Sequence, residues 1–224
     1  MIRATGVRAI VTDIEGTTGS IAFVHEVLFP YSRARLASFV AEHPDAVGPV
    51  LEEARRLAGE MDEAALVEAL IRWIDEDRKA GPLKTLQGMI WRSGYESGEI
   101  VGHVYDDAVR GLRRWREAGL RLAVYSSGSV EAQKLLFGHS RAGDLTGLFD
   151  AWFDTAVGAK ADSASYLRIA EALHEPPARV LFLSDAPAEI AAARAAGMQA
   201  VRLVREGQAA AGEAASFDEI DAAA

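Results

Sequence analysis

The 224-residue sequence contains no cysteine and comparatively few basic residues, and both features narrow the classes of protein that it can encode. Without cysteine there are no disulfide bridges, zinc–thiolate sites or thiol nucleophiles. Lysine and arginine together number 24 against 33 aspartates and glutamates, so the formal net charge is −9. Because nucleic acids and anionic membranes are bound by clustered positive charge, we expect neither as a partner.

Several sequence patterns are also missing. No apolar stretch reaches the length of about 18 residues that would predict a membrane-spanning helix. The first residues lack the charged head and apolar run of a signal peptide. The glycine-rich fingerprints of NTPases and dinucleotide-binding proteins are absent as well. We therefore expect a soluble, cytoplasmic and monomeric protein that acts on a small molecule.

Short apolar runs alternate with helical patterns through much of the chain. Half of the residues are apolar and 25% are charged, which is typical of a globular protein. Short buried strands that alternate with helices predict an α/β fold, with a doubly wound, mostly parallel sheet covered on both faces. The expected strands are 8–13, 120–126, 179–185 and 199–204, and the expected helices are 106–118, 129–138, 162–173 and 187–196.

Residues 21–102 interrupt this alternation. Their apolar residues recur with helical spacing, and prolines divide the segment into about four helices. We expect residues 1–20 and 103–224 to form the α/β catalytic core and residues 21–102 to form an inserted helical cap. An insertion after the first strand would lie over the crevice where such sheets bind ligands. The acidic stretch 206–224 is expected to be a frayed helix or tail.

The first expected strand ends at Asp13, which Glu15 and Thr17 follow. Residues i and i+2 of an extended chain point the same way, so Asp13 and Glu15 can face one crevice. One would then act as a nucleophile and the other as a proton donor or base. The alternative is a turn-forming aspartate beside a solvated glutamate.

Polar residues also follow the later strands. Ser126 and Ser127 precede a helix whose N–H groups can bind an anion, although a simple serine cap is the alternative. Asp185 and Glu189 can hold magnesium, or can merely favour a helix N-terminus. Lys160 is either a surface lysine or a charge that faces a phosphate. Because parallel strands end at one edge of a sheet, these side chains are predicted to meet there.

This order of residues resembles the four motifs of the haloacid-dehalogenase-like phosphohydrolases, with Glu15 where most members have aspartate. The resemblance implies a Rossmann-like core and a Mg²⁺ ion bound by Asp13, Asp185 and the main-chain carbonyl of Glu15. It also implies an aspartyl-phosphate on Asp13 and acid–base catalysis by Glu15. The remaining implied roles are phosphate binding by Ser126, Ser127 and Lys160, and support of the metal from outside its direct ligands by Glu189.

Longer segments narrow the resemblance to one subfamily. Residues 13–18, 86–92, 115–119 and 125–140 are similar to the enolase-phosphatases (acireductone synthases) of methionine salvage. This resemblance implies that 2,3-diketo-5-methylthiopentyl 1-phosphate is enolised and then dephosphorylated to 1,2-dihydroxy-3-keto-5-methylthiopentene. Two alternatives stay open: a general small-molecule phosphatase of the same superfamily, and a binding protein without catalytic activity.

Overall fold

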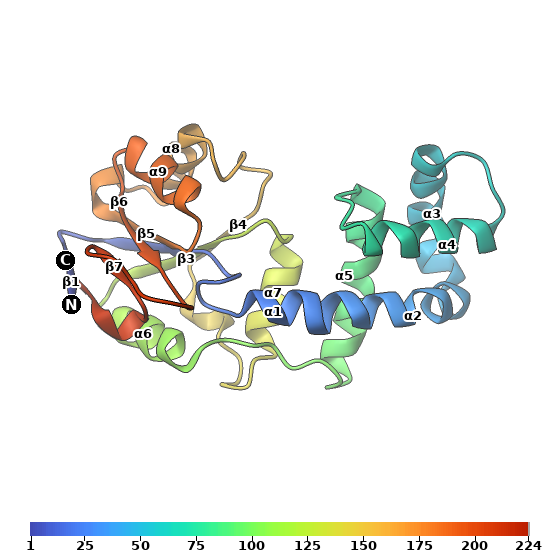
Figure 1. Ribbon diagram of the computed structural model, residues 1–224, viewed down its shortest axis with the longest axis horizontal. Helices are drawn as coiled ribbons and strands as arrows, with labels where there is room; N and C mark the ends of the chain where they lie inside the picture. Colours follow the sequence, from blue (N-terminus) through green and yellow to red (C-terminus); the bar gives the residue numbers. More distant parts are fainter. Residues whose placement is uncertain (224) are drawn as a thin grey trace. The chain divides into compact units, whose positions relative to one another are not determined.

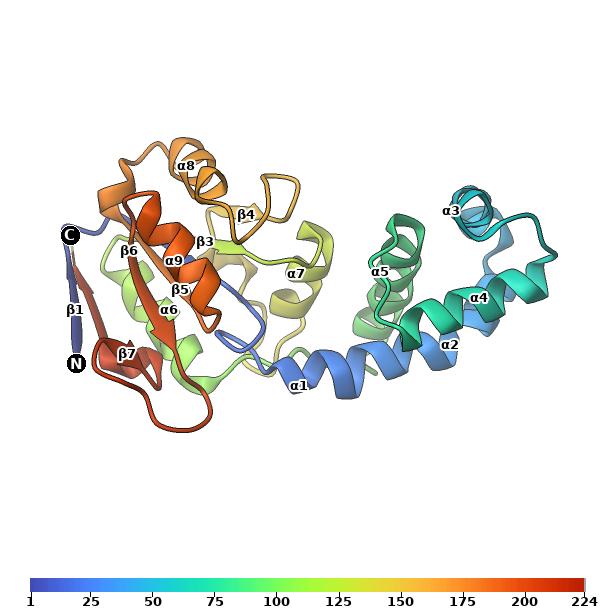
Figure 2. The ribbon, with the colours of Figure 1, turned by 45° about the horizontal axis from the view of Figure 1, so that its top comes forward.

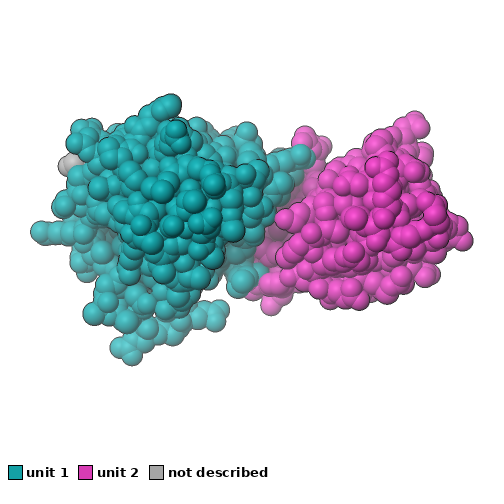
Figure 3. Space-filling view, turned by 90° about the horizontal axis from the view of Figure 1, so that it is seen from above, with its two compact units in different colours: residues 1–21, 102–224 teal, residues 22–101 magenta. Residues whose placement is uncertain are grey.

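The structure is a computed structural model of the chain and describes residues 1–223. It divides into two compact units, which Figure 3 shows in different colours. The core unit consists of Met1–Ile21 and the described chain from Gly102 onward, and the helical unit consists of Ala22–Val101. Within the described residues, no helix is both long and apolar enough to cross a membrane.

A six-stranded parallel sheet forms the centre of the core unit (Figure 1). Its central strands are continuous apolar runs rather than alternating ones, because helices cover both faces of the sheet. The predicted α/β fold with a mostly parallel sheet is confirmed. The spatial order of the strands is β4 (Ala151–Phe153), β3 (Arg121–Tyr125), β2 (Ala9–Thr12), β5 (Val180–Ser184), β6 (Gln199–Leu203) and β7 (Glu213–Ala214).

Helices cover both faces of this sheet, as Figures 1 and 2 show. Every second residue of the strands, including Val11 and Phe182, packs with Tyr166 and Ile169 in the core beneath one pair of helices. The four helices predicted for the core are present, with ends within two residues of those expected. They are α6 (Asp106–Glu117) and α7 (Val130–Gly138) on one face, and α8 (Ser163–Ala172) and α9 (Pro187–Ala195) on the other.

Strand β2 lies between β3 and β5, where the order of the strands reverses. Thr12, its last residue, pairs with Val124 of β3 and Leu183 of β5. The three strands are parallel, so the residues that follow them leave the sheet at the same edge. In doubly wound sheets this edge, at such a switch point, is where ligands bind.

The expectation of a frayed helix or tail over 206–224 is wrong for the described residues from Glu213 onward. That segment contains β7, a short 3-10 helix (Phe217–Glu219) and β8 (Ile220–Ala223). Strand β8 pairs in parallel with β1 (Ile2–Thr5), a strand that the sequence patterns did not reveal. Phe217 and Ile220 are buried, so these two apolar side chains anchor a segment whose composition is otherwise acidic.

In the helical unit, α1 (Ile21–Phe23) leads into a π-helix (Val24–Leu28), and four longer helices follow. Three of these four helices have a proline in their first turn, where the missing N–H of proline costs no helical hydrogen bond. Pro49 instead lies inside α3 rather than between helices. The helices are α2 (Phe29–Glu42), α3 (Pro44–Ala58), α4 (Glu63–Asp75) and α5 (Gly81–Glu96), and they share one buried apolar core.

Replacing Phe217 by alanine tests whether the C-terminal segment belongs to the core. The Phe217 side chain is fully buried, and its ring lies 5.3 Å from that of Trp115. Removing it leaves a cavity, so we expect a loss of about 3–5 kcal/mol in the free energy of unfolding, measured by urea denaturation. Leu167→Ala, at a position 49% exposed, is the control and should cost about 0.5 kcal/mol or less. Equal denaturation midpoints for Phe217→Ala and the wild type would contradict the packing.

Candidate active site

A buried ion cluster lies at the carboxyl end of β2. Asp13 directly follows this strand, and its carboxylate Oδ1 lies 2.7 Å from Nζ of Lys160. The same ammonium group is 2.9 Å from Oε2 of Glu189, at the start of α9. The side chains of Asp13, Lys160 and Glu189 are 5%, 12% and 14% exposed. The structure therefore brings together three of the residues that the sequence singled out, from segments that are distant along the chain.

Glu15 lies in the turn after β2 and not on an extended continuation of the strand. It is nevertheless close enough for the charge of Asp13 to act on its carboxylate, and its main chain forms a bridge with Gly19 in the same turn. The hydroxyl of Ser126, after β3, donates a hydrogen bond of 3.1 Å to Oε2 of Glu15. The same hydroxyl accepts the N–H of Gly128 at 3.2 Å, so it links the turn after β2 to the loop after β3.

Asp185, which follows β5, is held through its main chain. Its N–H donates to the hydroxyl of Thr17 at 3.0 Å, and its carbonyl accepts from Nε of Arg202 at 2.9 Å. Its carboxylate lies against Gly16, where a Cβ atom would come within 2.3 Å of Oδ2. Gly16 also has φ = 71°, a conformation that favours glycine. The turn after β2 therefore depends on glycine to let the Asp185 carboxylate approach.

Ser127 is exposed, one residue after the buried Ser126. The helix that follows, α7, is capped by Ser129, whose hydroxyl accepts the N–H of Ala132 at 3.3 Å. The capping alternative therefore holds for Ser129. Ser126 has a different environment, because its hydroxyl bonds to Glu15.

The sequence patterns missed one residue of the cluster, Ser184, and one residue that binds the turn after β2, Arg205. Ser184 is fully buried, and its hydroxyl lies 2.8 Å from Oε2 of Glu189 and 3.5 Å from Oδ2 of Asp13. Arg205 donates from Nε to the carbonyl of Thr17 at 2.9 Å. The position of Ser184 next to Asp185 in a strand-end segment was a signal for the first, whereas nothing in the spacing pointed to Arg205.

Burial and mutual repulsion set the ionisation of the cluster. Burial raises the pKa of Asp13, even though Lys160 lies beside it. Burial also raises the pKa of Glu15, Asp185 and Glu189, and the negative charge of Asp13 adds to each shift. Burial works to lower the pKa of Lys160, but the carboxylates of Asp13 and Glu189 raise it above its ordinary value. Lys160 is therefore a stable cation here, whereas the negative charges of the carboxylates repel one another.

The donor set fits a divalent cation that is only partly surrounded by protein. Among residues 1–223, no three histidine, aspartate or glutamate side chains form a ready metal cage. Mg²⁺ usually takes one or two carboxylates and completes its shell with water and substrate oxygens. Asp13 and Asp185 supply two such carboxylates, and each carboxylate repels the other in the absence of further positive charge. A divalent ion would relieve that repulsion.

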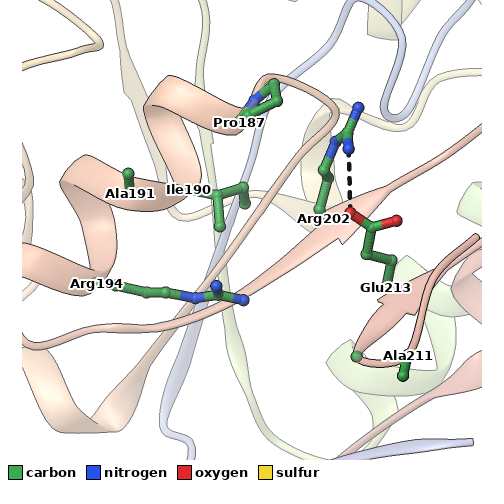
Figure 4. A pocket seen from close by; sticks show the side chains of 8 residues that line it. Pro187, Ile190, Ala191, Arg194, Arg202, Ala211 and Glu213 are labelled. Carbon is green, nitrogen blue, oxygen red and sulfur yellow. Dashed lines mark hydrogen bonds and ion pairs between the residues drawn. The ribbon is translucent and has the colours of Figure 1, made fainter.

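A surface pocket of the core unit has Arg202 and Glu213 among its lining residues (Figure 4). Arg202 forms an ion pair of 3.0 Å with Glu213 at the pocket wall and also bonds to the Asp185 carbonyl. The residues that line the pocket come from α9, β6 and the segment around β7. Asp13, Glu15 and Lys160 are not among them, so the pocket is separate from the ion cluster.

The comparison with known proteins agrees with the fold. The model of the haloacid dehalogenase-like hydrolase family matches residues 7–197, and the chain belongs to this family. The enolase-phosphatase E1 of Methylococcus capsulatus is 55% identical over 221 residues, which cover 96% of this chain and 97% of the relative. That of Parvibaculum lavamentivorans is 58% identical over 205 residues, with 90% and 87% covered. Within the hydrolase family, the chain is a member of the enolase-phosphatases.

A solved structure shares this fold over nearly the whole chain. The UTR4 protein of Saccharomyces cerevisiae is 31% identical, with a TM-score of 0.79 and 96% of each chain covered. Phosphatases of the haloacid dehalogenase-like family generally use a divalent metal ion, which is consistent with the donor set at Asp13 and Asp185.

Replacing Glu15 by glutamine tests the electrostatic crowding of the metal-free protein. A carboxyl group whose pKa is raised by folding contributes stability at low pH, and this contribution is lost as the pH rises through the folded pKa. The free energy of unfolding of Glu15→Gln, relative to wild type, should therefore increase from about pH 4 to about pH 7. Urea denaturation in EDTA at the two pH values measures this difference.

The exposed residue Glu68 provides the matched control, since Glu68→Gln removes a carboxylate on the surface of the helical unit. Its stability relative to wild type should change little between the two pH values. A constant difference between Glu15→Gln and wild type at both pH values would contradict the raised pKa of Glu15.

Proposed function

We propose that the protein is a magnesium-dependent enolase-phosphatase of methionine salvage. Its proposed substrate is 2,3-diketo-5-methylthiopentyl 1-phosphate, and its products are 1,2-dihydroxy-3-keto-5-methylthiopentene and phosphate. The observation that carries the proposal is the buried Asp13 carboxylate, 2.7 Å from Lys160 at the switch point of a parallel sheet. Membership of the enolase-phosphatases supports the choice of substrate over another small phosphate ester.

Asp13 is the proposed nucleophile. Its Oδ1 accepts two hydrogen bonds, from Lys160 at 2.7 Å and from the N–H of Ile14 at 2.8 Å. Oδ2 has a weaker contact, at 3.5 Å from the Ser184 hydroxyl, and is the oxygen that we assign to attack on phosphorus. A bond forms between Oδ2 and phosphorus while the bond from phosphorus to the substrate oxygen breaks. Water then hydrolyses the aspartyl-phosphate and releases phosphate.

Glu15 is the proposed acid–base group for this step. It would protonate the departing substrate oxygen and then take a proton from the attacking water. Burial and the charge of Asp13 raise its pKa, which favours the protonated form that a general acid needs. The hydrogen bond from Ser126 holds the Glu15 carboxylate in place. Glu15 can also carry protons during enolisation, whose C–H base we leave unassigned.

The remaining site residues bind charge. Lys160, Ser126 and Ser127 are proposed to bind phosphate oxygens, the Ser126 hydroxyl turning from Glu15 to the phosphate when substrate binds. Glu189 is proposed to support the metal site through its contact with Lys160. Asp13, Asp185 and the main-chain carbonyl of Glu15 would hold Mg²⁺. When bound, Mg²⁺ supplies positive charge that lets a carboxylate approach a phosphate and polarises the carbonyl oxygen during enolisation.

The helical unit is proposed to act as a cap that recognises the methylthio end of the substrate. Within this unit, Phe29 stacks on Trp91, with ring centroids 6.4 Å apart, and Trp91 donates to the carbonyl of Leu28 at 2.8 Å. These contacts hold an aromatic pair on which an apolar group can rest. The monomeric state and the cytoplasmic location stay predictions from the sequence.

Incubation with the diketo phosphate distinguishes this function from that of a general phosphatase. We expect ultraviolet absorbance from a conjugated enol to appear and then change as phosphate is released. EDTA should stop phosphate release, and added Mg²⁺ should restore it. Phosphate release without any enol intermediate would favour a general phosphatase, whereas an absence of both signals with Mg²⁺ present would favour a binding protein.

A further inference from the structure

The loop that carries Lys160 is held by three buried hydroxyl groups, from Tyr125 at the end of β3 and from Ser165 and Tyr166 in α8. All three residues have an exposed fraction of 0%. Their hydroxyls donate to three consecutive main-chain carbonyls, those of residues 158–160. The bonds are Tyr125 Oη to Gly158 O at 3.0 Å, Ser165 Oγ to Ala159 O at 2.8 Å and Tyr166 Oη to Lys160 O at 2.6 Å.

The two tyrosine rings are fixed by the core around them. The rings of Tyr125 and Tyr166 meet edge to face, with centroids 5.7 Å apart. The Tyr166 ring also meets that of Phe182 on β5, at 4.9 Å. Because close-packed side chains keep their rotamers, each hydroxyl is presented to the loop from a rigid position. Burial of an unbonded hydroxyl would be costly, so these bonds are maintained as long as the core is.

Gly158 fits the same arrangement. Its φ is +140°, which an L-residue rarely adopts, and a Cβ atom there would lie within 2.2 Å of the Ser165 hydroxyl. Glycine therefore allows the loop to come close enough for the Ser165 hydroxyl to reach the next carbonyl. The close approach and the three hydrogen bonds are features of one interface between the loop and the core.

Holding the main chain of Lys160 limits where its side chain can lie. Lysine has a flexible four-carbon chain, so the position of its ammonium depends on where its main chain is held. Here Tyr166 binds the carbonyl of Lys160 itself, while Asp13 and Glu189 bind the ammonium at 2.7 and 2.9 Å. Because both ends of the Lys160 side chain are already held, the side chain loses less conformational freedom when its ammonium binds a phosphate oxygen.

We propose that Tyr125, Ser165 and Tyr166 are positioning residues for Lys160, which hold its main chain so that its ammonium meets a phosphoryl group at the end of β2. This inference rests on the proposed role of Lys160 in binding phosphate. The three residues act through the loop and do not touch the phosphate.

Tyr166→Phe is the sharpest test, because it removes one hydroxyl and keeps the ring. We expect its affinity for inorganic phosphate, measured calorimetrically with Mg²⁺ present, to fall roughly three- to tenfold, the usual range for one hydrogen bond. Ser165→Ala should act in the same direction and replaces Tyr166→Phe if that variant does not fold. Tyr31→Phe is the matched control, since it removes a hydroxyl that donates to Glu99 at 3.0 Å in the helical unit. Its phosphate affinity should equal that of the wild type.

A double-mutant cycle with Lys160→Ala separates positioning from general damage. If Tyr166 acts through Lys160, then Tyr166→Phe should change phosphate affinity by less than about twofold in the Lys160→Ala background. Lys160→Met replaces Lys160→Ala if the alanine variant does not fold. An equal loss in both backgrounds, or no loss in either, would overturn the positioning role.

The same cycle keeps this inference distinct from the proposed function. Lys160→Ala alone should weaken phosphate binding. If it does not, the assignment of Lys160 to the phosphate is wrong, and the positioning role fails with it. If Lys160→Ala weakens binding while Tyr166→Phe does not, the phosphate role stands and the positioning role alone is overturned.

Discussion

The ammonium group of Lys160 is the charge around which the site is organised. It lies between Asp13 and Glu189 and is nearly buried, while two further carboxylates, those of Glu15 and Asp185, stand close enough for Asp13 to raise their pKa. The single positive charge of Lys160 cannot neutralise four ionised carboxylates. The strand ends, the glycine at position 16 and the hydroxyls of Ser126 and Ser184 therefore hold together groups that repel one another.

This crowding links stability to function. Carboxylates with raised pKa values oppose folding at neutral pH, so the core must supply the free energy that keeps them together. The buried apolar residues of strands β2, β3 and β5 and the helices on both sides of the sheet provide it. A divalent metal ion would add positive charge and so offset the repulsion among these carboxylates.

The sheet and much of the cluster were predictable from the sequence, because short apolar runs ended in polar residues and parallel strands end at one edge. Asp13, Ser126 and Asp185 each follow one of three neighbouring parallel strands, so they lie at the same edge of the sheet. The direct contact between Lys160 and Glu189 was not predictable, since it depends on side-chain geometry between a loop and the first turn of α9. Strand β8 was missed because it is short and lies in an acidic stretch that suggested solvent, whereas its burial depends on pairing with β1, at the far end of the chain.

Detection of a phosphorylated Asp13 tests the central claim most directly. The protein would be mixed with its substrate and Mg²⁺, quenched rapidly in acid, digested and examined by mass spectrometry. We expect a phosphoryl group on the peptide that contains Asp13, present during turnover and absent from Asp13→Asn. Phosphate release with no phosphorylated peptide at any quench time, or a phosphoryl group on a different residue, would show that Asp13 is not the nucleophile.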